Sequence, residues 1–403
     1  MYARLLRLNI FSKFFNVILL LIYFEFLRNW LTIQQVGDLG KILTVLGLAK
    51  VLSAAPLAQT YARFNHLNTI DYNIEKLTIL FIWNCSLASI FVFFANKFFE
   101  TGLNILFCLM LVIAICLISL QKTFFLINLK KFRHLVVSNV EDIFFRFFLP
   151  IALILTSFEI NEIFIATLAA ISIFLFVFTQ NKTNFFRIFI KLVTTKILFK
   201  FPERNDQFNI LKNTIITSLG SMTISYFDRF FVEFRLGTAS LAVLFLFITL
   251  QNLILTGFSV FVGTLQNSEF LNKGNLSKAF YLITTAFFCI ILIVLNIQWN
   301  KFGYFLDLVG GNFGDNLTSL QFCWAISSAI VLLNCNLYSI YFYKRNKSNI
   351  LSLVWGLGAL VNVVSNFILF EYLGLDGVFL STLLSFLVIL FSLIFFMINS
   401  NEK

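Results

Sequence analysis

Twelve apolar stretches, each long enough to cross a lipid bilayer, follow one another from about residue 11 to residue 398. The hydrocarbon core of a bilayer is about 30 Å thick, so a helix that spans it needs roughly 20 mostly apolar residues. Because no water is present there to bond to backbone amides, each stretch must be helical. A hydrophobic fraction of 59% and a charged fraction of 12% agree with this interpretation. The chain is predicted to be an all-α polytopic membrane protein.

We expect the helices at residues 11–31, 37–62, 77–96, 103–125, 135–157, 160–180, 208–230, 238–264, 278–298, 317–343, 348–370 and 376–398. Basic residues precede the first stretch, as in a signal peptide. Its apolar run is too long for a signal peptide, however, and no small-residue cleavage site comes after it. This stretch is therefore expected to remain as the first helix.

The positions of Lys and Arg predict how the chain is oriented. Most of the 30 basic residues fall in segments on the same side as the N-terminus, whereas the opposite loops are mainly acidic. The positive-inside rule then places both termini in the cytoplasm, which twelve crossings also require. The net charge of +11 reflects this topology, with anionic membrane lipids compensating it. Because the basic residues are spread over many loops, no nucleic-acid-binding surface is expected.

The longest connection, residues 181–207, divides the chain into three parts. Residues 1–180 form an N-terminal lobe of six helices, 181–207 a cytoplasmic linker, and 208–403 a C-terminal lobe of six more helices. Since six is even, both lobes begin inside and run parallel, so a pseudo-two-fold axis along the membrane normal relates them. The exterior loops are short and no nucleotide-binding motif is present, so we expect neither an enzyme nor an ATPase.

Three segments at predicted exterior turns match known patterns. The first, Leu31-Thr-Ile-Gln-Gln-Val-Gly37, is similar to an L-S-P-E-E-Y-G turn, with Ile33 in place of proline and glutamines in place of acids. A second segment, from Asp228-Arg to Leu-Gly237, is similar to D-R-x-x-x-x-x-x-L-G. A third, Tyr372-Leu-Gly-Leu-Asp-Gly and then Ser-Thr-Leu-Leu-Ser385, looks like L-G-x-x-G-A-A-x-A-T-x-x-S. In order and spacing they resemble the polysaccharide transporters of the MOP superfamily, in particular O-antigen flippases.

The resemblance implies a MATE-like fold of two six-helix lobes around a cavity that opens alternately to each side. It further implies a bacterial inner-membrane flippase, which moves an undecaprenyl-diphosphate-linked oligosaccharide, such as an O-antigen repeat unit, to the outer leaflet. A polysaccharide polymerase and a chain-length regulator would be its partners. Two alternatives stay open: a multidrug or cation antiporter of the same superfamily, and a membrane polysaccharide polymerase or ligase.

A diphosphate headgroup cannot enter hydrocarbon bare, so a flippase needs cations inside a water-filled cavity. Ionisable residues within the predicted helices are therefore the candidates for substrate binding: Lys50, Arg28, Arg146 and Arg229. Each has a structural alternative. Lys50 could pair with Glu25 for assembly, and the arginines could neutralise acids on their own helices or anchor helix ends.

Polar residues trace one stripe along the predicted helix 208–230, at steps of three and four: Thr214, Thr217, Ser218, Ser221, Ser225 and Asp228. We expect Ser218, Ser221 and Ser225 to line the cavity, together with Asn252 and Asn362 from two further stripes. Asp228 and Glu25 are candidates for coupling transport to H⁺ or Na⁺, which the sequence leaves as alternatives. Hydrogen bonding between helices would explain the same stripes. The six cysteines and two histidines show no ligand spacing, so no metal site or cofactor is expected.

Overall fold

The computed structural model describes residues 14–64, 74–101 and 105–115, the first and last with gaps, and residues 206–271, 277–298, 318–345 and 347–400. The chain divides into two compact units, one of residues 1–40 and 219–403 and the other of residues 41–218. Every regular element among the described residues is an α-helix: α2 (Ile33–Phe64), α3 (Ile74–Phe98), α9 (Asp206–Leu236), α10 (Thr238–Leu271), α11 (Lys278–Ile297), α13 (Ser319–Lys344), α14 (Ser348–Leu373) and α15 (Leu375–Ile398).

These eight helices coincide with eight of the predicted spans. The first span is also helical over residues 16–25, and the described residues between 105 and 115 are helical where the fourth span was expected. The fifth and sixth spans and residues 181–205 of the predicted linker lie outside the described residues, and α9 begins at Asp206, two residues before the predicted helix 208–230. The all-helical architecture is thus confirmed, whereas the count of twelve helices and the lobe boundaries stay predictions.

Local hydrogen bonding explains why two helices are longer than the hydropathy predicts. The Thr32 backbone amide donates to Gln35 Oε1 over 2.9 Å, and the Gln35 amide donates to Thr32 Oγ1 over 3.3 Å. This capping box starts α2 four residues before the apolar run. The second longer helix is α9, which continues past the predicted end to Leu236. Gly237, with φ of +78°, then turns the chain directly into α10.

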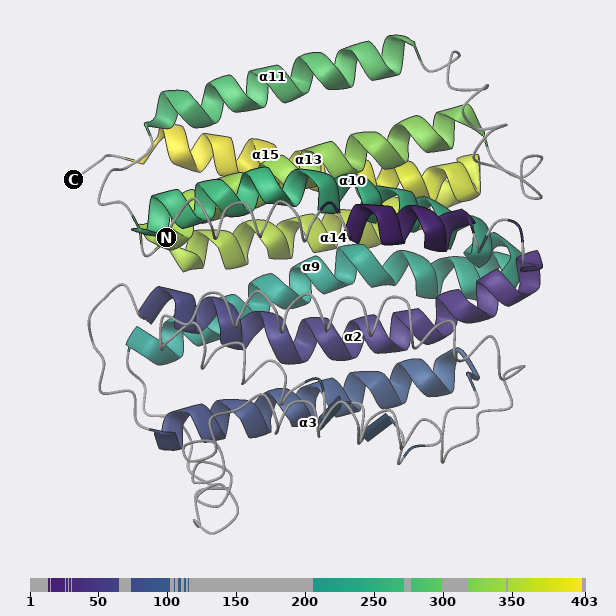
Figure 1. The fold of residues 1–403 in the computed structure, drawn as a ribbon, viewed down its shortest axis with the longest axis horizontal. Coiled ribbons are helices and arrows are strands. Elements are labelled where there is room, and N and C mark those ends of the chain that lie inside the picture. The colour runs from purple at the N-terminus through teal and green to yellow at the C-terminus, as the bar shows by residue number, and fades with distance from the viewer. Residues whose placement is uncertain are drawn as a thin grey trace. The chain divides into compact units, whose positions relative to one another are not determined.

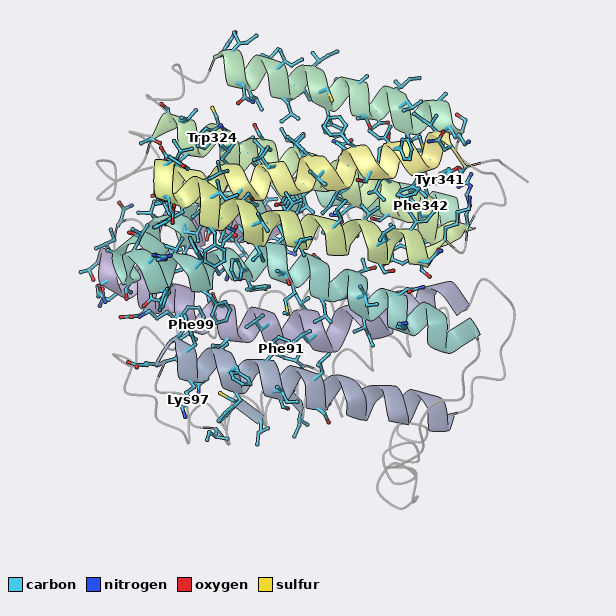
Figure 2. All side chains as sticks on the ribbon, turned by 180° about the vertical axis from the view of Figure 1, so that it is seen from behind. Phe91, Lys97, Phe99, Trp324, Tyr341 and Phe342 are labelled. Carbon is cyan, nitrogen blue, oxygen red and sulfur yellow. The ribbon has the colours of Figure 1, made fainter. Side chains whose placement is uncertain are left out.

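Helix α13 lies at the centre of the first unit. It packs against α10, α11, α14 and α15 (Figure 1). Helix α13 contributes three fully buried aromatic side chains to the core: Tyr338, Tyr341 and Phe342. Trp324 lies near one end of α13 and Tyr341 and Phe342 lie near the other (Figure 2). The aromatic core is therefore concentrated in the last turns of this helix.

The first unit carries many apolar side chains on its surface as well as in its core, and several polar side chains are buried inside it. On α11 the exposed side chains include Ile283, Phe287 and Ile297, whereas Thr285 is buried. Buried polar side chains occur on α13, α14 and α15: Ser327, Ser328, Asn334, Asn362, Asn366, Ser381 and Ser385. In this part of the chain, α10, α11, α13, α14 and α15 are each long and apolar enough to cross a membrane. This distribution is the one expected where lipid, not water, surrounds the protein.

Charged groups separate toward the two ends of the first unit. At one end, Lys278 Nζ donates to the Ser400 carbonyl oxygen over 2.7 Å, and the Arg345 guanidinium lies 3.7 Å above the ring of Tyr341. At the opposite end of α13 and α15, Gln321 Nε2 donates to Asp376 Oδ1 over 2.5 Å. The predicted basic and acidic faces, and which of them is cytoplasmic, stay predictions.

In the second unit, α3 shows the same lipid-facing pattern. Ala88, Val92 and Ala95 recur at helical spacing and are buried, whereas Phe93 and Phe94 are exposed. The described residues after α3 repeat it, with Cys108, Val112 and Ile115 buried and Ile105, Leu109 and Ile113 exposed.

The joint between α14 and α15 gives a test of this packing. Gly374, with φ of +57°, separates the two helices, and a Cβ at Gly377 would lie 2.4 Å from the Leu369 carbonyl oxygen. Gly377→Ala should therefore force the two helices apart and cost roughly 1–3 kcal/mol. Gly356→Ala is the matched control, because a Cβ there has nothing within 4 Å. Thermal unfolding of the purified protein should show a lower midpoint for Gly377→Ala alone; equal midpoints would contradict the close approach.

Candidate functional site

Asp228 lies inside the first unit, where three helices meet. Its side chain comes from α9 and is only 4% exposed. Helix α9 reaches this depth because its small residues let it approach α14: a Cβ at Gly220 would lie 2.7 Å from the Trp355 carbonyl oxygen. Three residues after Asp228 on α9, the Phe231 ring packs on Phe367 and Phe370 of α14, with centroid distances of 5.1 Å to each. These contacts fix the carboxylate against α14 and α15.

Both oxygens of the carboxylate accept a hydrogen bond from a neutral side chain. Asn366 Nδ2 on α14 donates to Asp228 Oδ1 over 2.7 Å. Thr382 Oγ1 on α15 donates to Oδ2 and also lies 3.2 Å from the Val378 carbonyl oxygen. One carboxylate thus ties α9 to both α14 and α15. A buried ionised carboxylate is costly without compensating charge, and the two direct donors are neutral, so the neighbouring Arg229 is the positive charge that interacts with it.

Two buried asparagine side chains lie beside the carboxylate. Asn362 and Asn366, one turn apart on α14, are both 0% exposed. Among the described residues, no partner is found for the amide oxygens of Asn362 and Asn366, and the Asn362 side chain also interacts with the Asp228 carboxylate. Buried polar atoms are almost always satisfied in folded proteins, so the two amide oxygens beside the carboxylate are candidate ligand atoms.

Serine hydroxyls of α14 and α15 form further hydrogen bonds next to the two asparagines. Ser381 Oγ donates to the Asn362 carbonyl oxygen over 3.0 Å, and the Ser365 and Ser381 hydroxyls are 2.5 Å apart. Ser385 Oγ donates to the Ser381 carbonyl oxygen over 2.7 Å. The two hydrogen bonds of Ser381 to α14 join α14 to α15 and hold the two asparagines in register with Thr382.

The side chain of Arg229 lies next to the site. It is 8% exposed, and its guanidinium carbon lies 4.6 Å from the centre of the Tyr226 ring on the same helix. A buried guanidinium beside a buried carboxylate is unusual within an apolar bundle and marks this level of α9 as polar.

The remaining predicted residues are spread over several helices. Glu25 is exposed and its Oε2 accepts from Asn29 Nδ2 over 2.9 Å. Lys50 lies in α2, but its side chain, like Arg28 and Arg146, is outside the described residues. Along α9, Ser218 is buried, Ser221 half-buried and Ser225 exposed. On α10, Asn252 is half-buried. The structure therefore brings together Asp228, Arg229 and Asn362, and does not test the predicted roles of the other residues.

Asn366 and Thr382 belong to the site but were not among the residues predicted from the sequence. Asn366 lies four residues after Asn362 on the predicted stripe of α14, and Thr382 lies inside the third family-like segment. The signal was an amide pair at helical spacing within an apolar span, which seldom occurs without a polar partner.

The fold resembles those of known transporters. The crystal structure of a MATE transporter in complex with MaD3S has a TM-score of 0.52 and 13% identity, covering 98% of this chain and 94% of that one. The outward-facing conformation of a multidrug resistance MATE family transporter of the MOP superfamily has a TM-score of 0.51 and 13% identity, covering 97% and 93%. No protein-family model and no curated protein matches the sequence. The chain has the MATE transporter fold.

Removing one donor to the carboxylate tests the geometry of the site. Thr382→Val keeps the shape of the side chain but leaves Asp228 Oδ2 without this partner, so the free energy of unfolding should fall by roughly 1.5–3 kcal/mol. Thr382→Ser keeps the hydroxyl and should retain most of the stability. Thermal unfolding of the purified variants measures the difference. Equal losses for Val and Ser would mean that packing of the methyl group, not the hydrogen bond, matters here.

Proposed function

We propose that this chain is a bacterial inner-membrane flippase, which exports an undecaprenyl-diphosphate-linked oligosaccharide by alternating access and couples this movement to a cation at Asp228. The MATE fold supports transport across a membrane as the activity class. The buried carboxylate, with unsatisfied amide oxygens around it, is the observation that carries the coupling site.

The groups at Asp228 suit a hard monovalent cation such as Na⁺, which prefers oxygen ligands. Asp228 would supply its carboxylate, Asn362 and Asn366 their amide oxygens, Thr382 its hydroxyl and Val378 its backbone carbonyl. When bound, the cation would place a positive charge in direct contact with the carboxylate, in addition to the neighbouring Arg229. Because these ligands come from α9, α14 and α15, binding would favour the arrangement in which the three helices are packed together.

The choice of substrate rests on the sequence. The three family-like segments span both halves of the chain, and basic residues outnumber acidic ones among the predicted site residues: Lys50, Arg28, Arg146 and Arg229 against Glu25 and Asp228. Fixed cations suit a diphosphate headgroup, whereas a cavity for organic cations would favour acids. The lipid tail would stay in the bilayer while the oligosaccharide crosses through the cavity.

A multidrug exporter is the second candidate. It is favoured by the name of one structural neighbour, a multidrug resistance MATE family transporter. The two functions differ in phenotype: loss of a flippase removes surface glycan and leaves drug susceptibility unchanged, whereas loss of a drug exporter does the reverse.

Sodium should stabilise the purified protein through Asp228. A ligand at about 100 times its Kd adds about 2.7 kcal/mol to the free energy of unfolding, so the unfolding midpoint should be higher in NaCl than in choline chloride at equal ionic strength. Asp228→Asn should abolish this difference, while Asp376→Asn, which alters an acid outside the site, should retain it. A sodium effect that survives in Asp228→Asn would exclude this residue as the site. A midpoint that responds to pH but not to sodium would identify the coupling ion as H⁺.

Lys50 is the test of the substrate. Lys50→Ala should reduce surface glycan at least tenfold, because the cavity loses a fixed charge for the diphosphate, and Lys50→Arg should restore most of it. Lys97→Ala, at the exposed end of α3 (Figure 2), is the control and should have no effect. Glycan is measured on cells whose only copy of the gene is the variant, at matched protein levels. Normal glycan with Lys50→Ala, together with increased drug susceptibility when the gene is deleted, would favour the multidrug alternative.

A further inference from the structure

The first turns of α2 and α10 approach one another unusually closely. A Cβ at Gly37 would lie 2.3 Å from the carbonyl oxygen of Thr238, a separation that no side chain tolerates. One turn further, a Cβ at Gly40 would lie 3.3 Å from the Cβ of Phe245. Two glycines three residues apart thus form the face by which α2 meets α10. Any larger residue at position 37 would push the two backbones apart.

The residues of α10 that adjoin this contact are buried. All seven residues from Leu241 to Phe247 are buried, so α10 is covered on every side from its second turn through Phe247. Helix α13 covers one side of α10, and the Phe247 ring packs on Phe379 of α15 with a centroid distance of 4.9 Å. The face toward α2 is closed by the first turns of that helix, where Val36 and Leu39 are fully buried.

The two turns occupy equivalent places in the two predicted halves. Residues 31–37 connect the first and second predicted helices, and residues 235–237 connect the seventh and eighth. Both belong to the predicted exterior face. Arg235 lies 6.0 Å from the centre of the Phe370 ring, so this connection also adjoins the joint between α14 and α15. Residues 1–40 accordingly group with residues 219–403 as one compact unit.

We propose that the contact of Gly37 and Gly40 with Thr238 and Phe245 is the exterior closure of the transport pathway, and that it must separate in each cycle. This inference rests on the proposed alternating access. Helices that start in different predicted halves meet here through a close backbone approach and apolar side chains, which can part and reform without breaking covalent structure. The glycines set how tightly the exterior face closes, because they allow the two helix ends to touch.

A disulfide across the contact tests the closure directly. Native disulfides have Cβ atoms about 3.5–4.5 Å apart, and the 3.3 Å separation of positions 40 and 245 comes close to that range once the Phe245 ring is removed. The double variant Gly40→Cys with Phe245→Cys should therefore form a disulfide on mild oxidation in membranes. Oxidised cells should export at least tenfold less glycan, and a reductant should restore export. Each single variant under the same oxidation is the control and should be unaffected by it.

A second measurement needs no knowledge of the substrate. The thiol of Phe245→Cys is monitored by peptide mass spectrometry after a membrane-impermeant maleimide is added from outside. Combining it with Gly37→Ala should increase labelling at position 245 severalfold, because the added methyl group props the closure open. Combining it with Gly356→Ala, where the added methyl group meets no atom within 4 Å, should not. Native Cys335, which is fully buried in the core, reports whether the protein has unfolded.

Each outcome is decisive. A disulfide that forms without affecting export, or the absence of any disulfide on oxidation, would overturn the closure. Equal labelling at position 245 in the Gly37→Ala and Gly356→Ala backgrounds would overturn it as well. If labelling responds to Gly37→Ala but wild-type cells export no glycan through this protein, the closure stands and the proposed substrate is wrong.

Discussion

The hydrogen bonding of one buried carboxylate organises the C-terminal part of this molecule. Asp228 on α9 accepts from Asn366 on α14 and from Thr382 on α15, so three helices that could each face lipid are held together by a polar centre. In a membrane, apolar surfaces gain little from leaving lipid for protein, and polar contacts therefore decide which helices associate and in what register. The serines and asparagines around Asp228 serve this purpose, and the amide oxygens of Asn362 and Asn366 offer further ligand atoms beside it.

The helices of this fold could be predicted from the sequence because the bilayer imposes both their length and their character. The spans expected at 278–298, 348–370 and 376–398 agree with α11, α14 and α15 to within three residues. Where the prediction missed, at the start of α2 and the end of α9, the cause was local. A capping box at Thr32 and the positive φ of Gly237 determine those ends, and hydropathy does not register either of them.

The site was only partly predictable for a different reason. The polar stripe on α9 and the asparagines of α14 could be recognised one helix at a time, and Asp228 and Asn362 were predicted in this way. A stripe shows which face of a helix is polar but not which other face it meets. The pairing of Asp228 with Asn366 and Thr382 joins residues 138 and 154 positions apart, and it depends on how α9 crosses α14 and α15. Small hydroxyl residues also serve in helix packing. A serine on the stripe therefore does not reveal its own environment, and Ser218 is buried whereas Ser225 is exposed.

Helix α11 is a membrane helix with few neighbours. Most of its surface is apolar and exposed, and it packs on α13. Polar contacts hold it at three levels: Lys278 to Ser400, Thr285 to Tyr338 over 2.9 Å, and Asn296 to Ser327 over 3.1 Å. These three contacts fix the position of α11 along its neighbours, and its exposed apolar face would have to match the thickness of the surrounding lipid. A membrane that is too thin or too thick would therefore strain these three bonds first, and lipid composition would act on the protein through this helix.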